Sequence, residues 1–321
     1  MDKWTTLNEP WCSAWLGYGY GHHAPGRDEI GLAVAATHNL LFAHGLGVRA
    51  ARSIRPQAEI GLTLNLGVLR PGTTDPQDLE AVRRADGNQN RIFLDPLFKG
   101  SYPQDMLEHY AHMTPGFSVV QDGDLDVISS PIDFLGVNFY SPGTVFDARR
   151  EFEARAMGYN VGPRPEEPTS NNLQIIGVET PGRPKTAMDW EIDATGLREL
   201  LLRIKDEYTQ IPLFITENGA AFHDYVDTDG QVRDPQRIQY VHDHLGACLD
   251  AIDAGVNLRG YFLWSLLDNF EWAVGYSRRF GIVWVDYDTG RRIPKHSFHW
   301  YRGVVTGNIL SPLEGRLDPH K

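Results

Sequence analysis

The sequence has few cysteines and no long apolar run. Cys12 and Cys248 are the only two cysteines in 321 residues, too few for a disulfide framework, so we expect a reducing compartment and a cytoplasmic location. No apolar run approaches the roughly 20 residues of a membrane-spanning helix. Residues 1–4 lack the charged-then-apolar pattern of a signal peptide. Without repeats, low-complexity tracts or linkers, the chain is expected to form one globular domain over 1–321.

Positive charge is also scarce. The 30 Lys and Arg are outnumbered by 42 Asp and Glu, which gives a formal net charge of −12. Such a surface repels phosphate backbones and anionic lipids, so the sequence predicts neither a nucleic-acid partner nor a membrane partner. The 41% of hydrophobic residues is enough for a sizeable core, and the length suits a single α/β barrel.

Five short, almost continuously apolar segments indicate strands that are covered on both faces, as in a parallel sheet. They are residues 4–7, 60–66, 134–139, 213–216 and 258–266. Helical patterns lie between them, at 29–52, 76–86, 194–208 and 234–254. This alternation predicts a βαβ architecture.

The pattern at 234–254 is the clearest of the helices. Asp234 is a good N-cap residue, and Gly255 stands where a C′ glycine belongs. One apolar stripe is predicted to face the core, formed by Ile238, Val241, Leu245, Leu249 and Ile252.

Polar residues gather where the predicted strands end. The sequence there reads TLNEP at 6–10, GVNFY at 136–140, ITENG at 215–219 and WSLLDNFEW at 264–272. Because the C-terminal ends of parallel barrel strands carry the active site, Glu9 and Glu217 are expected to meet at one mouth. A single Glu after a strand is more often a cap or a surface acid. Two, each beside an Asn and near aromatic residues, favour cleavage of glycosidic bonds.

These motifs resemble those of glycoside hydrolase family 1, the retaining β-glucosidases, and the likeness runs from residue 4 through 280–283 to about 301. The resemblance implies a TIM (β/α)8 barrel with Glu9 as the acid/base and Glu217 as the nucleophile. We expect Glu217 to be ionised and its charge to keep Glu9 protonated. The resemblance also implies a set of substrate-binding side chains: Asn8 on the sugar 2-hydroxyl, Asn138 in the same polar shell, Tyr140 on the nucleophile, Trp264 as the stacking wall, Glu271 and Trp272 on the outer hydroxyls, Phe280 on the glycone side and Trp190 on the leaving-group side.

A small β-glucoside or cello-oligosaccharide is the expected substrate, with no cofactor. A 6-phospho-β-glycosidase is an alternative, but the carboxylate of Glu271 would repel a sugar phosphate, although Arg278 or Arg279 could reach the pocket. Glu9 argues against the myrosinases, which resemble this family but have Gln at that position. Galactose or fucose in place of glucose stays open.

One pair of histidines and one cysteine invite a metal or thiol function that the sequence does not support. His109 and His112 lack a further cluster of ligands, so no metal site is predicted. Cys12 follows the first motif but has no His partner in the sequence, and we interpret it as a buried structural thiol.

Only five strand–helix units can be counted, whereas a closed barrel of this type has eight. The resemblance implies that they are units four to eight, so the chain is expected to be a fragment or a truncated gene model. Its partner would then be the missing N-terminal part of the barrel. A non-catalytic half-barrel that binds sugar or complements another fragment is the alternative function. The segment 141–192, rich in Pro and Gly, is expected to be a long loop at the active-site face.

Overall fold

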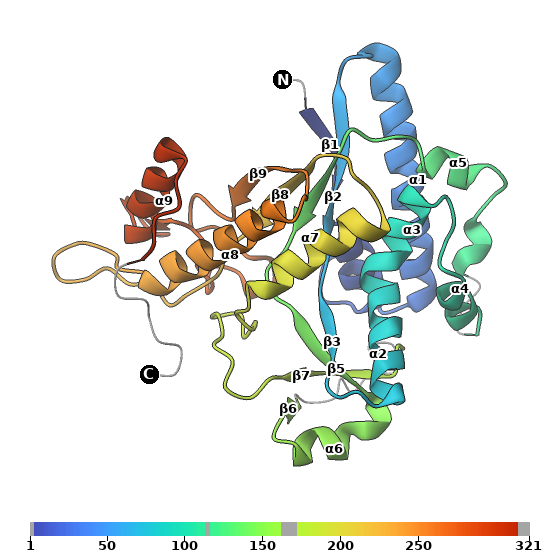
Figure 1. Cartoon of the computed structure of the whole chain (residues 1–321), viewed down its shortest axis with the longest axis horizontal. Helices are drawn as coiled ribbons and strands as arrows, with labels where there is room; N and C mark the ends of the chain where they lie inside the picture. The colour runs from blue at the N-terminus through green and yellow to red at the C-terminus, as the bar shows by residue number, and fades with distance from the viewer. Residues whose placement is uncertain (1–2, 113–115, 162–171, 314–321) are drawn as a thin grey trace.

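A five-stranded parallel sheet runs through the centre of the molecule (Figure 1). The structure is a computed structural model that describes residues 3–112, 116–161 and 172–313. All neighbouring strands of this sheet are parallel. In spatial order they are β1 (Lys3–Asn8), β2 (Glu59–Asn65), β4 (Phe134–Asn138), β8 (Leu213–Asn218) and β9 (Leu258–Leu263). Each corresponds to one predicted strand, so the parallel sheet is confirmed.

Helices connect these strands. The predicted helices are found as α1 (Ile30–Ile54), α2 (Pro76–Asp86), α7 (Thr195–Glu207) and α8 (Pro235–Asp253). The other helices are α3 (Ile92–Phe98), α4 (Gln104–Ala111), α5 (Asp124–Ile128), α6 (Glu151–Ala156) and α9 (His296–Gly307). β10 (Val283–Val285) and β11 (Arg292–Pro294) form an antiparallel pair ahead of α9.

The main core lies between the sheet and these helices. Leu62, Leu135 and Ile215 of the sheet are fully buried against Leu41 of α1 and Leu201 of α7. The strands are therefore continuously apolar because both faces of the sheet are covered, as expected for a parallel sheet.

Helix α8 departs from its predicted packing. Asp234 occupies the N-cap position, but its side chain caps no backbone N–H of α8. It instead accepts hydrogen bonds from the buried Arg237 and from the Ser297 backbone and hydroxyl, which tie α8 to α9. Gly255 has φ +87°, as a C′ glycine requires.

The buried face of α8 follows the predicted stripe only in part, because Val241 is buried and Leu245 packs beside it, but other members are not covered. Leu249 and Ile252 are exposed, whereas Tyr240, His244 and Ala251 are fully buried. The prediction counted aliphatic residues only, but the buried surface also includes the Tyr240 hydroxyl, which donates to the Tyr140 backbone oxygen, and His244, whose Nδ1 makes a hydrogen bond with the Tyr240 backbone oxygen.

The segment 141–192 is more ordered than the expected long loop. Its described residues contain β5 (Gly143–Asp147), α6, β6 (Asn160–Val161) and β7 (Ile175–Glu179). With β3 (Leu69–Pro71) these strands form a second sheet in the order β3-β5-β7-β6. It packs on its own small core around Phe146, and residues 162–171 lie outside the described part of the chain.

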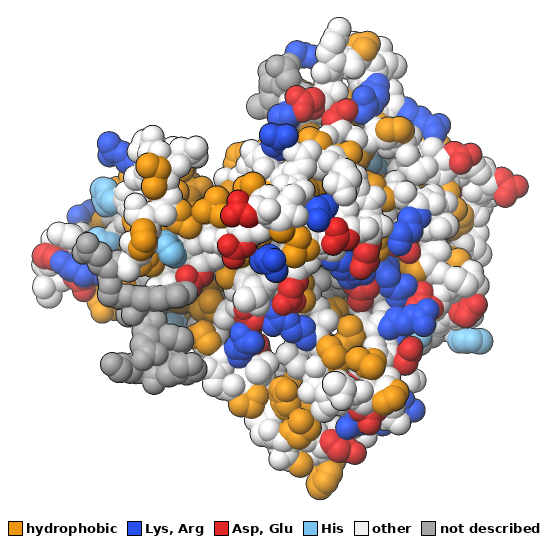
Figure 2. All heavy atoms as spheres, viewed as in Figure 1, with side chains coloured by type: hydrophobic (Ala, Val, Ile, Leu, Met, Phe, Trp, Pro, Cys, Tyr) orange, Lys and Arg blue, Asp and Glu red, His pale blue; other side chains and the backbone are white. Residues whose placement is uncertain are grey.

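The edges of the main sheet are β1 and β9, which within the described residues each pair with a single neighbour. Both carry large exposed apolar side chains, with Trp4 of β1 51% and Phe262 of β9 58% exposed. Figure 2 shows hydrophobic side chains at the surface over β8 and β9. The sheet is thus open, with apolar surface at both edges.

Helix α1 has the length of a membrane-spanning helix, although the sequence predicts no apolar run of that length. Its 25 residues are long and apolar enough to span a membrane by length and composition alone. Val34, Leu41 and Val48, however, are buried inside the protein. Because core helices pass the same test, we interpret α1 as part of the core.

Candidate active site

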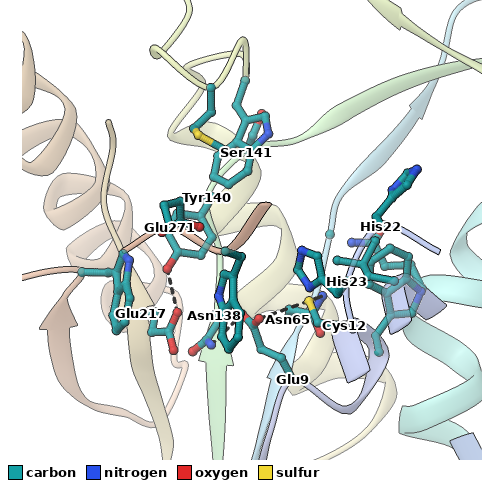
Figure 3. Close-up of a pocket in the computed structure, with 18 of the residues that line it drawn as sticks. Glu9, Cys12, His22, His23, Asn65, Asn138, Tyr140, Ser141, Glu217 and Glu271 are labelled. Carbon is teal, nitrogen blue, oxygen red and sulfur yellow. Dashed lines mark hydrogen bonds between the residues drawn. The ribbon is translucent and has the colours of Figure 1, made fainter. Parts of the chain in front are cut away.

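The C-terminal ends of the main-sheet strands meet at one cavity of about 1040 Å³ (Figure 3). The strand register places Asn65 beside Asn138 and Asn138 beside Glu217. All the predicted site residues line this cavity: Asn8, Glu9, Asn138, Tyr140, Trp190, Glu217, Trp264, Glu271, Trp272 and Phe280. The sequence therefore predicted a set of residues that the fold brings together from segments far apart in the chain.

Two asparagines bridge the two carboxylates. Asn138 Nδ2 donates to Glu9 Oε1 at 2.8 Å and to Asn8 Oδ1 at 3.1 Å. Asn8 Nδ2 in turn donates to Glu217 Oε1 at 3.3 Å. The hydroxyl of Thr216 donates to Asn138 Oδ1 at 2.6 Å, which fixes the orientation of that amide. Glu9 and Glu217 are thus held on the two sides of one amide pair.

Tyr140 holds the other oxygen of Glu217. Its hydroxyl donates to Glu217 Oε2 at 2.6 Å, as Figure 3 shows. Burial, followed by the charge of Glu217, raises the pKa of Tyr140 well above its ordinary value. Tyr140 therefore stays protonated and remains a donor to the carboxylate.

Gly219 lets the end of β8 approach the end of β9. A Cβ on Gly219 would lie 1.8 Å from the carbonyl oxygen of Trp264, well inside contact distance. Asn218 Nδ2 also donates to the Phe139 backbone oxygen at 2.6 Å. The residues after Glu217 therefore fix the nucleophile candidate against both neighbouring strands.

The pKa of Glu217 is raised in this site. Burial, and then the charge of Glu9, raise the pKa of Glu217 to about 7, while donation from Tyr140, Asn138 and Asn8 opposes the shift. Glu217 is therefore more readily protonated than an ordinary glutamate. The sequence-based expectation of an ionised Glu217 did not include the burial of that carboxyl group.

This shift predicts that Glu217 makes the stability of the protein depend on pH. A carboxyl whose pKa rises on folding favours the folded state at low pH and destabilises it progressively between its unfolded and folded pKa values. The Glu217→Gln variant is expected to match the wild type near pH 4 and to gain up to about 3 kcal/mol relative to it by pH 8. Urea unfolding at a series of pH values measures this difference.

Glu153→Gln is the matched control, because Glu153 is an exposed glutamate on α6. Its stability difference from the wild type should stay flat over the same pH range. A flat Glu217→Gln difference would show that burial leaves the ionisation of Glu217 unchanged.

Aromatic side chains form one wall of the cavity. The Trp190 ring lies 5.4 Å from that of Tyr140 and 6.1 Å from that of Phe280, centroid to centroid. Trp264 lines the same cavity. Faces of this kind suit the apolar C–H surface of a sugar ring and of an aromatic leaving group.

The outer part of the cavity combines an acid with an exposed aromatic. Burial and then the charge of Glu9 raise the pKa of Glu271. Trp272 is 67% exposed and stacks on His23 with 5.7 Å between ring centroids. Both side chains can therefore meet a ligand at the mouth of the cavity.

No Lys or Arg side chain lines the cavity in the described part of the chain. Arg279 Nη1 instead donates to Asp268 Oδ2 at 2.7 Å, and its guanidinium lies over the rings of Trp284 and Tyr287. Arg278 is likewise absent from the lining. Neither arginine is therefore placed to contact the phosphate of a sugar phosphate in this cavity.

Metal ligation has no cluster of side chains to support it in the residues that the structure describes. They contain no group of three or more His, Cys, Asp or Glu side chains able to hold an ion. His109 Nε2 makes a hydrogen bond with the Asn172 backbone oxygen at 3.1 Å.

The sequence analysis missed several residues of the cavity: Cys12, His22, His23, Asn65, Gln89 and Met188. Asn65 could have been found, because it lies at the end of a predicted strand, as Asn138 does. Cys12 was interpreted as a buried structural thiol, but it is only partly buried and contacts Glu9. Its position three residues after Glu9 was the available signal.

Comparison with known proteins identifies the family of the chain. A family model described as "Glycosyl hydrolase family 1" matches residues 1–309. The "Beta-glucosidase A" of Thermotoga maritima is 43% identical, over 97% of this chain and 64% of its own length. The "Bifunctional beta-D-glucosidase/beta-D-fucosidase" of Bifidobacterium breve is also 43% identical, over 95% of this chain and 64% of its own length.

Solved structures give the same result. The beta-glucosidase from Thermotoga maritima in complex with deoxynojirimycin superposes with a TM-score of 0.86 and 42% identity, covering 97% of this chain and 65% of that one. The chain thus spans about 64% of the length of the curated relatives that it matches.

Proposed function

The chain belongs to glycosyl hydrolase family 1, and from this we propose that it acts as a retaining β-glucosidase that removes the terminal non-reducing β-D-glucosyl residue of β-glucosides. One observation carries the proposal. Glu9 and Glu217 lie on the two sides of an Asn8–Asn138 pair, and Tyr140 donates to the second oxygen of Glu217. A retaining mechanism needs two carboxyl groups that flank one glycosidic bond in this manner.

The proposed reaction has two steps. In the first, a Glu217 oxygen attacks the anomeric carbon, the bond to the leaving-group oxygen breaks, and Glu9 gives that oxygen its proton. In the second, Glu9 takes a proton from water, the water oxygen bonds to the anomeric carbon, and the Glu217 ester bond breaks. The product keeps the β configuration because the anomeric carbon is inverted twice.

The reactive state needs its proton on Glu9 and none on Glu217. Tyr140 and Asn8 donate to Glu217 and so favour its carboxylate form. Asn8 also lies where a contact to the sugar 2-hydroxyl can strengthen in the transition state, as differential binding requires.

We propose an unphosphorylated β-glucoside or cello-oligosaccharide as the substrate. The acidic Glu271 and the absence of Lys and Arg among the described lining residues disfavour a sugar phosphate. The name of the Bifidobacterium breve relative includes β-D-fucosidase, and we keep a fucoside as a second substrate. The two free thiols support the proposed cytoplasmic location.

We further propose that the five-stranded sheet corresponds to units four to eight of an eight-unit barrel. The open edges, the exposed Trp4 and Phe262, and the 64% coverage of the relatives support this. In a closed barrel every strand has two neighbours, so no edge is left open. The same features favour the alternative function, in which the chain gains activity only with a polypeptide that supplies the other units.

Hydrolysis of a chromogenic β-glucoside tests these proposals. The chain is assayed alone and after co-expression with a polypeptide that carries the three further βα units of a family relative. We expect the rate to rise at least about 100-fold on addition, because the loops of those units would complete the substrate site. Chain and polypeptide should also co-elute in gel filtration.

The control repeats the assay with the Glu217→Gln chain, which should stay inactive with the added units. Absence of hydrolysis in a co-eluting wild-type pair would contradict the β-glucosidase proposal. A full rate in the chain alone would contradict the proposal of missing units.

A further inference from the structure

We propose that Cys12 is a positioning residue for the acid/base, because its thiol donates a hydrogen bond that fixes one oxygen of Glu9. The inference rests on the proposed function for the role of Glu9, but the contact itself can be tested without turnover.

The Cys12 thiol lies between Asn65, which donates a hydrogen bond to it, and Glu9, which accepts one from it. Cys12 begins the π-helix Cys12–Gly19 immediately after the first motif. Its Sγ lies 3.2 Å from Glu9 Oε2, and Asn65 Nδ2 donates to Sγ at 3.5 Å. Figure 3 shows Glu9, Cys12 and Asn65 side by side in the cavity. The sulfur accepts from Asn65, so its own proton is directed to Glu9.

The thiol stays protonated in this place. Burial, and then the charge and hydrogen bond of Glu9, raise the pKa of Cys12 far above its ordinary value, and Glu217 and Glu271 add to the shift. A thiol in such surroundings is a donor and a poor nucleophile. Cys12 therefore acts on Glu9 and does not compete with Glu217 for the anomeric carbon.

With Cys12, both oxygens of Glu9 have a donor from the protein. Asn138 donates to Oε1 and Cys12 to Oε2. The two bonds fix the plane of the carboxyl group on a residue whose backbone is in the left-handed region, at φ +48°. Hydrogen bonds of this kind stabilise a carboxylate, and the second step uses a carboxylate to take a proton from water.

The first test compares Cys12→Ala with Cys12→Ser in the preparation that hydrolyses β-glucosides. Without a donor, the basic limb of the kcat/KM profile should move to higher pH by about half a unit. We also expect kcat to fall about three- to tenfold with little change in KM, because the acid is less well oriented. Cys12→Ser keeps a donor and should restore the limb.

Cys248→Ala is the matched control, because Cys248 is a buried free thiol in the main core and outside the cavity. It should leave the basic limb where it is in the wild type. The proposal is overturned if Cys12→Ala and Cys12→Ser share the wild-type limb, or if both lose activity alike without moving it.

The second test needs no turnover. Iodoacetamide labelling at pH 8.5, followed by peptide mass spectrometry, measures the reactivity of Cys12 with Cys248 as the internal reference. Glu9→Gln removes the adjacent negative charge and should raise Cys12 labelling at least about threefold, because the thiolate becomes easier to form. Unchanged labelling would refute the contact. If labelling increases in Glu9→Gln while the co-eluting wild-type pair hydrolyses no β-glucoside, the contact is supported and the proposed function is refuted.

Discussion

Replacing Glu217 by alanine is expected to lower the turnover of β-glucosides by at least about 10⁴-fold, in whichever preparation of the chain is active. Without this carboxylate no glycosyl-enzyme ester can form. The substrate cavity keeps its aromatic wall, so KM should change far less than kcat. Steady-state kinetics with an aryl β-glucoside measure both.

Added azide separates the loss of a nucleophile from a loss of folding. In the Glu217→Ala variant, azide can occupy the space of the missing carboxylate and attack the anomeric carbon while Glu9 protonates the leaving group. The product should be the α-glucosyl azide, because only one inversion takes place. Glu153→Gln on the surface of α6 should keep wild-type kinetics. A Glu217→Ala variant with intact turnover would assign the nucleophile to another residue.

Replacing Glu9 by alanine is expected to have an effect that depends on the leaving group. For a poor leaving group that needs protonation, the first step should slow by about 10²- to 10⁴-fold. For an activated leaving group such as 2,4-dinitrophenolate, the first step should change little, and the second step should limit the rate. Pre-steady-state measurement of the phenolate burst distinguishes the two steps.

Azide should restore turnover in the Glu9→Ala variant with the opposite stereochemistry. It attacks the glycosyl-enzyme ester without needing a general base, so the product is the β-glucosyl azide. The contrast between α product from one variant and β product from the other identifies the role of each glutamate. Equal losses for good and poor leaving groups would argue against Glu9 as the general acid.

The main sheet and the site could be predicted because their signals are local and strong. Each central strand is a continuous apolar run, and residues such as Asn138 and Glu217 follow such runs directly. The ends of parallel strands share one edge, so spatial proximity followed from chain order alone. Asn65 also lies at the end of a predicted strand, so the same reasoning would have placed it in the site.

Other features depend on tertiary contacts that no periodicity carries. The second sheet uses short strands within a Pro- and Gly-rich segment, and β5 is anchored by Arg84, which donates to Asp147. The burial of Glu217 that raises its pKa comes from several distant segments. The π-helix that turns Cys12 toward Glu9 has no apolar stripe by which it could be recognised.

The Asn8–Asn138 bridge holds Glu9 and Glu217 in place through side chains that do not titrate. Amide side chains neither gain nor lose a proton across the range in which carboxyl groups titrate. The spacing of the two glutamates is therefore set by groups that keep the same donors and acceptors at every working pH. A pH–rate profile of this site should then report how protons are distributed between Glu9 and Glu217, with no contribution from titration of the amide bridge.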